Sequence, residues 1–206
     1  MSAAPGPDPS EVGYDASTAL LVVDLQNDFA DPAGGLHVAG GEDLAALLRP
    51  HLAAARAAGA PVVLTQDWHP PRTPHFDTDG GPWPVHCVAG TWGAELVDGL
   101  DVGPDDPVVR KGSDGGDGYS GFSVRDPVTG DVERTALQRL LDERGVRRVV
   151  VTGLAGDVCV AATARDAVGL GYQTVYPVAL TRFVEAQAGD GERALAELRG
   201  LGVAVV

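Results

Sequence analysis

Short apolar runs alternate along this chain with segments whose apolar residues recur at helical spacing. The runs have the length and the Val and Leu content of buried strands. The other segments place an apolar residue every third or fourth position, as an amphipathic helix does. The predicted strands cover residues 18–23, 61–65, 107–110, 147–152, 172–176 and 203–206. The predicted helices cover residues 42–58, 133–144, 157–169 and 191–199.

This alternation continues from residue 18 to the end of the chain. It is typical of a mainly parallel sheet that is covered by helices on both faces. We therefore expect an α/β fold with three layers (αβα), Rossmann-like, with about six strands. No change of composition divides residues 18–206, so they should form a single domain. Residues 1–17 are rich in Pro, Ala, Ser and Gly, and we expect a flexible N-terminal arm there.

The composition of the chain limits the kinds of molecule that it is expected to bind. The net charge of −14 argues against nucleic acid, because binding phosphates requires a basic surface. No apolar run approaches the ~20 residues of a membrane span, and no signal peptide is visible. These features predict a cytoplasmic protein that acts on a neutral small molecule. In that compartment the two cysteines should be free thiols.

Three reactive residues follow predicted strands or begin a predicted helix. Lys111 is the only lysine among the fifteen basic residues, and it comes directly after an apolar run. Asp24 follows the first strand, and Cys159 lies just beyond residues 147–152. Ligands bind at the carboxyl ends of parallel strands, so these three side chains could form one site.

Together these residues could perform nucleophilic catalysis. A helix start and a nearby ammonium both favour a thiolate at Cys159, and Asp24 could accept the thiol proton. The backbone N–H groups of Ala155 and Cys159 could hold an oxyanion. The structural alternatives are that Asp24 caps a turn, that Lys111 is a solvated surface residue and that Cys159 is a small core residue.

A second group of polar residues lies in a long loop after the strand at 61–65. Asp67, His69, His75 and His86 offer one carboxylate and three imidazoles, a ligand set suited to Zn, Fe or Mn. The alternative is that they are polar loop residues in contact with water. Cys87 is a rival thiol, but no strand-to-helix turn accompanies it.

Two aromatic residues could complete such a site. Phe29 and Trp83 could stack on a planar ring, although either one could equally belong to the core.

Five sequence blocks, in order along residues 18–206, together resemble the isochorismatase-like cysteine hydrolases. They are VDLQNDF at 23–29, DWH at 67–69, WPVHCV at 83–88, KG at 111–112 and GDVCV at 156–160. The Asp, Lys and Cys blocks are those of the superfamily. The Asp-x-His and Trp-Pro-x-His-Cys blocks resemble its metal-bearing nicotinamidase (pyrazinamidase) branch.

The resemblance implies a reaction and its catalytic residues. Nicotinamide, and also pyrazinamide, would be hydrolysed through a thioester to the acid and ammonia, as a step of NAD salvage. Asp24, Lys111 and Cys159 would form the catalytic triad. A cis peptide bond between Leu154 and Ala155 would shape the substrate pocket and the oxyanion hole of Ala155 and Cys159.

The resemblance also implies how the substrate is bound. One divalent ion, Zn in the first place with Fe or Mn as alternatives, would be held by the four residues of the loop cluster and would bind the pyridine nitrogen. Phe29 and Trp83 would enclose the ring. One departure is Val158, where some relatives carry a histidine before the nucleophile.

Two rival functions remain at this stage. Another small amide, such as carbamoylsarcosine, maleamate or a ureidoacrylate, could be the substrate, and those branches do not need four metal ligands. Alternatively the chain could be a non-catalytic metal- or ligand-binding protein with the same fold. A dehydrogenase is poorly supported, because no G-x-G-x-x-G follows the first strand. A homo-oligomer is compatible with the sequence.

Overall fold

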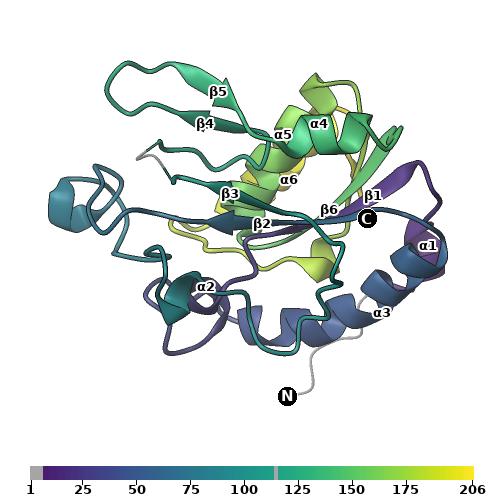
Figure 1. Cartoon of the computed structure of the whole chain (residues 1–206), viewed down its shortest axis with the longest axis horizontal. Coiled ribbons are helices and arrows are strands. Elements are labelled where there is room, and N and C mark those ends of the chain that lie inside the picture. Colours follow the sequence, from purple (N-terminus) through teal and green to yellow (C-terminus); the bar gives the residue numbers. More distant parts are fainter. Residues whose placement is uncertain (1–6, 114–115) are drawn as a thin grey trace.

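A six-stranded parallel sheet forms the centre of the molecule in the computed structural model, which describes residues 7–113 and 116–206 (Figure 1). The strands are β1 (Thr18–Val23), β2 (Val62–Asp67), β3 (Val108–Lys111), β6 (Arg148–Gly153), β7 (Gln173–Tyr176) and β8 (Ala204–Val205). Their order across the sheet is β3-β2-β1-β6-β7-β8, and every pair is parallel. The predicted fold class and strand number are confirmed.

Helices cover both faces of this sheet (Figure 1). The helix α3 lies on one face, and α4, α5 and α6 lie on the other. The α-helices are α1 (Pro9–Val12), α2 (Asn27–Ala30), α3 (Leu44–Ala57), α4 (Leu137–Asp142), α5 (Ala161–Gly169) and α6 (Asp190–Gly200). A π-helical turn, Gly156–Val160, leads directly into α5. Short 3-10 turns occupy Gly41–Asp43, Asp77–Asp79, Trp92–Ala94 and Val178–Leu180.

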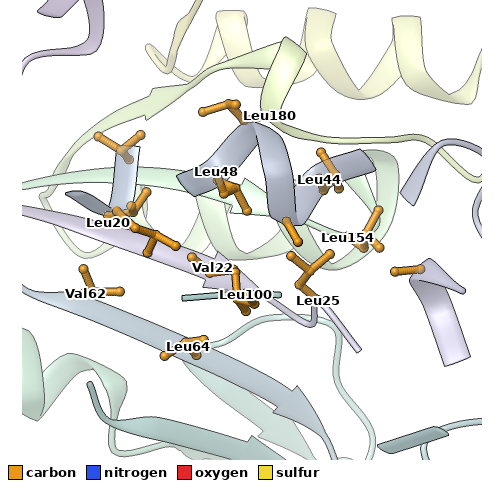
Figure 2. Close-up of a cluster of buried hydrophobic side chains, with 14 of the residues drawn as sticks. Leu20, Val22, Leu25, Leu44, Leu48, Val62, Leu64, Leu100, Leu154 and Leu180 are labelled. Carbon is orange, nitrogen blue, oxygen red and sulfur yellow. The ribbon is translucent and has the colours of Figure 1, made fainter. Parts of the chain in front are cut away.

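Each central strand contributes side chains to two apolar cores, because successive residues of a strand point to opposite faces. On β1, Leu20 and Val22 pack toward α3, where Figure 2 shows them near Leu44 and Leu48. The alternate residues Ala19, Leu21 and Val23 face the helices on the other side. A strand that is apolar at every position is therefore buried on both faces, as the uninterrupted pattern of residues 18–23 predicts.

One predicted helix was wrong in its first part. Residues 133–134 belong to a two-stranded antiparallel hairpin, formed by β4 (Ser123–Arg125) and β5 (Val132–Arg134). The side chain of Asp126 caps the turn between these strands by accepting from the backbone N–H groups of Val128 and Thr129. The helix begins at Leu137, whose N–H donates to the Thr135 hydroxyl.

The described part of the predicted N-terminal arm contacts the domain. Val12 of α1 is buried in the core, and the backbone carbonyl of Pro7 lies 2.9 Å from Nε2 of His51 on α3. Residues 1–6 of the arm lie outside the described residues. None of the helices in the described ranges has the length and apolar character required to traverse a lipid bilayer.

The sheet reverses its winding direction between β1 and β6. From β1 the chain moves outward through β2 to β3, and from β6 it moves the opposite way through β7 to β8. Ligands bind at such a switch point, beyond the carboxyl ends of the strands. At the end of β6, Gly153 has φ +105°, and a Cβ there would lie 2.1 Å from the Val23 carbonyl oxygen. Only glycine allows the two central strands to end this close together.

Candidate active site

The ends of three strands bring the predicted triad together. Asp24 follows β1, Lys111 ends β3, and Cys159 lies in the π-helical turn after β6. The Lys111 Nζ is 2.9 Å from Asp24 Oδ2 and 3.7 Å from Cys159 Sγ. Side-chain ligand atoms of Asp24 and Cys159 lie within 4.8 Å of each other. A thiol, a carboxylate and an ammonium therefore share one small volume at the switch point.

Asp24 is a buried carboxyl group in an unusual backbone conformation. Its φ is +46°, a left-handed value that Asp tolerates better than most residues. Oδ1 accepts a 2.6 Å hydrogen bond from the Thr65 hydroxyl, whereas Oδ2 lies 2.9 Å from Lys111 Nζ and has no aligned hydrogen-bond partner among the described residues. Burial raises the pKa of Asp24, and the neighbouring Asp67 adds to this against the opposing effect of Lys111. Oδ2 is therefore the oxygen that can take up a proton.

The state of the Cys159 thiol differs from the sequence prediction. We expected the helix start and Lys111 to favour a thiolate. In the structure burial raises the pKa of Cys159 well above its usual value, Asp24 and Asp67 act in the same direction, and only Lys111 opposes them. The sequence placed Asp24 beside the thiol, but it did not show the extent of burial or the presence of Asp67 as a second carboxylate. These effects favour the neutral thiol, so Cys159 needs a base to become a nucleophile.

Lys111 is not a solvated surface residue, since only 1% of it is exposed. Burial alone would lower its pKa, but the carboxylates of Asp24 and Asp67 hold the pKa well above the usual range. The second of these contacts is a 2.7 Å hydrogen bond from Nζ to Asp67 Oδ1. The ammonium is thus permanently charged and is shared by two buried acids.

Asp67 connects the triad to the histidine cluster. Its Oδ1 faces Lys111, while its Oδ2 lies 3.4 Å from His69 Nε2 and 3.7 Å from His86 Nε2. Although burial raises the pKa of Asp67, the Lys111 ammonium outweighs this and holds the pKa well below its usual value. Asp67 is therefore an ionised carboxylate, with one oxygen turned to each half of the site.

The three predicted histidines come together beside Asp67. Ligand atoms of His69, His75 and His86 lie within 4.8 Å of one another, and all three residues are buried. Nδ1 of His86 lies 2.6 Å from the Pro84 carbonyl, so it carries the proton and leaves Nε2 as an acceptor.

The hydrogen bonds of the histidine ring nitrogens indicate whether a metal ion fits this cluster. Both ring nitrogens of His69 and Nδ1 of His75 are buried without a hydrogen-bond partner among the described residues. Unpaired buried nitrogens are costly unless something binds them. A divalent ion among three imidazoles and one carboxylate would bind one nitrogen of each ring, so the donor set fits the predicted metal.

A pocket opens between the thiol and the histidines. Phe29 and Trp83 both line it, as predicted, together with Ala155. The other lining residues are Leu36, Val38, Asp67, His75, His86, Tyr119, Val158, Cys159 and Val184. Most of these side chains are apolar or aromatic, which suits a small aromatic ring with one polar substituent.

Leu154 does not contribute its side chain to this pocket. It is fully buried in the core that Figure 2 shows, near Leu44 and Leu25. The peptide bond between Leu154 and Ala155 is cis, as the resemblance implies. Nearby, the Gly156 N–H donates to the Arg182 carbonyl and the Val158 N–H to the Ala155 carbonyl. Of the two residues joined by the cis bond, Ala155 lines the pocket and Leu154 does not.

Cys87 does not compete as a nucleophile. It is fully buried in the core, its Sγ faces the Gly93 carbonyl at 3.9 Å, and it does not line the pocket. Burial raises the pKa of this thiol well above its usual value.

Several supporting residues were not identified from the sequence. Thr65 donates to Asp24, and Gln26 exchanges hydrogen bonds with the backbone of Asp67. Tyr119 accepts a 3.0 Å hydrogen bond from the Trp83 indole. Gln26 lies in the VDLQNDF block, which was a usable signal. Tyr119 lies in the glycine-rich loop, where no periodicity marks it.

Asp117 is a further acidic residue of the site that was not predicted from the sequence. Its Oδ1 lies 2.8 Å from His75 Nδ1. The only available signal was its place in the loop after Lys111.

Comparison with known proteins gives a consistent family. The isochorismatase domain family matches residues 18–206. A nicotinamidase/pyrazinamidase of Mycobacterium tuberculosis is 41% identical over 193 residues, covering 91% of this chain and 97% of the relative.

Solved structures agree with the sequence matches. A pyrazinamidase of Pyrococcus horikoshii in complex with zinc has a TM-score of 0.82 and 36% identity, covering 92% of this chain and 98% of that one. A structure of PnC1 from L. infantum in complex with nicotinate also has a TM-score of 0.82 and 36% identity, covering 100% of this chain and 96% of that one.

Proposed function

This chain belongs to the isochorismatase domain family, and from that membership we propose that it is a nicotinamidase that hydrolyses nicotinamide, and also pyrazinamide, to the acid and ammonia. The observation that carries the proposal is the Lys111 ammonium in contact with Asp24, Asp67 and Cys159, beside three histidines. This arrangement combines a cysteine hydrolase with a metal-binding group. The relatives that are nicotinamidases or pyrazinamidases support the choice of substrate.

The metal is part of the proposal. Asp67, His69, His75 and His86 would hold one divalent ion, and zinc is the first choice because a relative was solved with zinc. When bound, the ion supplies a Lewis-acid contact for the ring nitrogen of the substrate. Phe29 and Trp83 enclose the ring from the pocket walls.

The first chemical half-reaction forms a thioester. Asp24 removes the proton of the Cys159 thiol, and the Lys111 ammonium stabilises the thiolate as it forms. The sulfur attacks the carboxamide carbon, and the N–H groups of Ala155 and Cys159 hold the oxyanion, each such donor being worth about 3 kcal/mol. Asp24 then returns the proton to the nitrogen as the C–N bond breaks, and ammonia leaves.

The second half-reaction releases the acid. Asp24 is again ionised and can accept a proton from water as that water attacks the thioester carbon. The C–S bond breaks, the acid leaves, and the proton on Asp24 returns to Cys159. The raised pKa of Asp24 favours its role as general base and acid, because the carboxyl group must gain and lose a proton in each half-reaction near neutral pH.

Ammonia release from nicotinamide is the direct test. Purified protein loaded with Zn²⁺ should release ammonia and nicotinate in equal amounts, and a chelator should stop the reaction until the metal is restored. Cys159→Ala should be inactive while its metal content stays that of the wild type. Activity in Cys159→Ala, or full activity in metal-free protein, would refute the proposed mechanism.

A further inference from the structure

Asp117 is an acidic residue of the glycine-rich loop that takes no part in the proposed reaction. Its Oδ1 atom is buried, lies 2.8 Å from His75 Nδ1, and has no hydrogen-bond partner among the described residues. The same is true of His75 Nδ1. The two atoms are close enough for a hydrogen bond but are not aligned for one. Two unpaired polar atoms side by side are costly to bury, and a small turn of the imidazole would pair them.

We propose that Asp117 is a positioning residue of the metal centre, which accepts the Nδ1–H of His75 and thereby directs Nε2 toward the ion. Neutral imidazole carries one proton, so a proton fixed on Nδ1 leaves the lone pair on Nε2. A carboxylate behind a ligand histidine also raises its basicity, and removal of such a partner typically costs 10–100-fold in metal affinity. This inference rests on the proposed metal site.

His86 shows the same device in a second form. Its Nδ1 lies 2.6 Å from the Pro84 carbonyl, which fixes the proton there and leaves Nε2 free on the side of Asp67. His75 has no backbone carbonyl in this role among its described contacts, and the Asp117 carboxylate occupies the equivalent position at its Nδ1. His69, in contrast, has neither nitrogen paired.

The β4–β5 hairpin holds Asp117 in place. The backbone N–H of Asp117 donates to the Arg125 carbonyl at 2.6 Å, and the Arg125 N–H donates back to the Asp117 carbonyl. Arg125 is the last residue of β4, which pairs with β5. The hairpin, which contributes no lining residue to the substrate pocket, is thus connected by backbone hydrogen bonds to a metal ligand's partner.

The test is the affinity of purified, metal-free protein for Zn²⁺, measured by competition with a chromophoric chelator at fixed pH. Asp117→Ala should bind Zn²⁺ about 10–100-fold more weakly than wild type. Asp117→Asn, which keeps an acceptor oxygen, should lose less. Glu133→Gln is the matched control: it removes one negative charge from the β4–β5 hairpin, to which Asp117 is bonded, and should leave the affinity unchanged.

A second background separates positioning from direct binding. In His75→Ala protein, adding Asp117→Ala should cause no further loss, because Asp117 acts through His75. Replacing Zn²⁺ with Co²⁺ should give the same visible absorption bands in wild type and Asp117→Asn, because the ligand atoms are unchanged.

The outcomes are distinct. Unchanged Zn²⁺ affinity in Asp117→Ala overturns the inference, as does an equal extra loss in the His75→Ala background or a changed Co²⁺ spectrum, either of which makes Asp117 a ligand itself. If wild type itself fails to bind Zn²⁺, the proposed metal site fails instead. Circular dichroism of each metal-free variant excludes misfolding as the cause of a loss.

Discussion

At the scale of single residues, the Lys111 ammonium lies between two buried carboxylates, 2.9 Å from Asp24 and 2.7 Å from Asp67. Removing it would leave both acids without their cation in a region from which water is excluded. A broken buried ion pair typically costs 3–5 kcal/mol, far more than an exposed one.

We therefore expect Lys111→Met to lose about 3–5 kcal/mol of unfolding free energy in urea and to be inactive. Lys111→Arg should also be inactive, because a planar guanidinium cannot replace a compact ammonium beside the thiol. Arg110→Met, at the neighbouring position on β3, is the control, since Arg110 stacks on Trp68 and donates to Gln66 and is not part of the triad. A loss no larger in Lys111→Met than in this control would contradict the central role of the ammonium.

The Cys159 thiol should react slowly with alkylating agents at neutral pH. Its pKa is raised by burial and by two nearby carboxyl groups, so the thiolate fraction at pH 7 is smaller than for an ordinary cysteine and increases as pH rises. The measurement is the rate of iodoacetamide labelling of the Cys87→Ala protein between pH 7 and 10, followed by mass spectrometry. Labelling as fast at pH 7 as that of a free thiol in solution would show that the thiolate is already formed at rest.

Site residues of rare types could be identified from the sequence, whereas properties that depend on three-dimensional geometry could not. A single lysine, a thiol at a strand-to-helix turn and three clustered histidines were visible as residue types. The protonation state of Cys159 was not, because it depends first on burial and then on two carboxyl groups that are distant in sequence. The role of Asp117 was invisible for the same reason.

At the scale of elements, the positions of the apolar runs predict the positions of the buried strands closely, because a strand buried on both faces needs apolar residues throughout. The boundaries of β1 were predicted to the residue. The β4–β5 hairpin was missed because its strands are exposed and carry no apolar alternation. Its signal was the turn sequence Asp126-Pro127-Val128-Thr129-Gly130, in which Asp126 caps the turn.

The helix α3 connects to the N-terminal segment through His51, and this connection should depend on pH. Burial lowers the pKa of His51 below 6.5, against the effect of its bond to Pro7. The unfolded chain therefore binds the proton more readily, so the contribution of His51 is intact above about pH 6.5 and is lost as pH falls toward the folded-state pKa.

Urea unfolding at pH 7.5 and pH 5 measures this effect. The wild type should lose more stability between these two pH values than His51→Gln does. His37→Gln, which changes a partly exposed histidine beside Glu42, should keep the wild-type difference. An identical pH dependence in wild type and His51→Gln would exclude His51 as the group responsible.

At the scale of the whole molecule, the metal site and the fold should stabilise each other. Folding brings the ligand atoms of the three histidines within 4.8 Å of one another, so an ion should bind the folded chain more tightly than the unfolded one. At a free Zn²⁺ concentration 100 times the dissociation constant, the expected gain is about 2.7 kcal/mol.

Thermal unfolding with Zn²⁺ and with a chelator tests this prediction. Zn²⁺ should raise the Tm of the wild type and of Cys159→Ala equally, because Cys159 is not a ligand. His69→Ala should show a much smaller increase. If the Tm of wild type is the same with Zn²⁺ and with chelator, the histidine cluster does not bind the metal in the folded protein.

The reversal of the sheet between β1 and β6 also determines when activity can arise. Base, cation and nucleophile come from residues 24, 111 and 159, so a nascent or truncated chain that stops short of β6 carries no nucleophile at all. No early, partly assembled state can turn over substrate. During refolding, the first released ammonia therefore marks molecules in which β1, β3 and the turn after β6 have already come together, and an enzyme assay reports the assembly of these three distant segments.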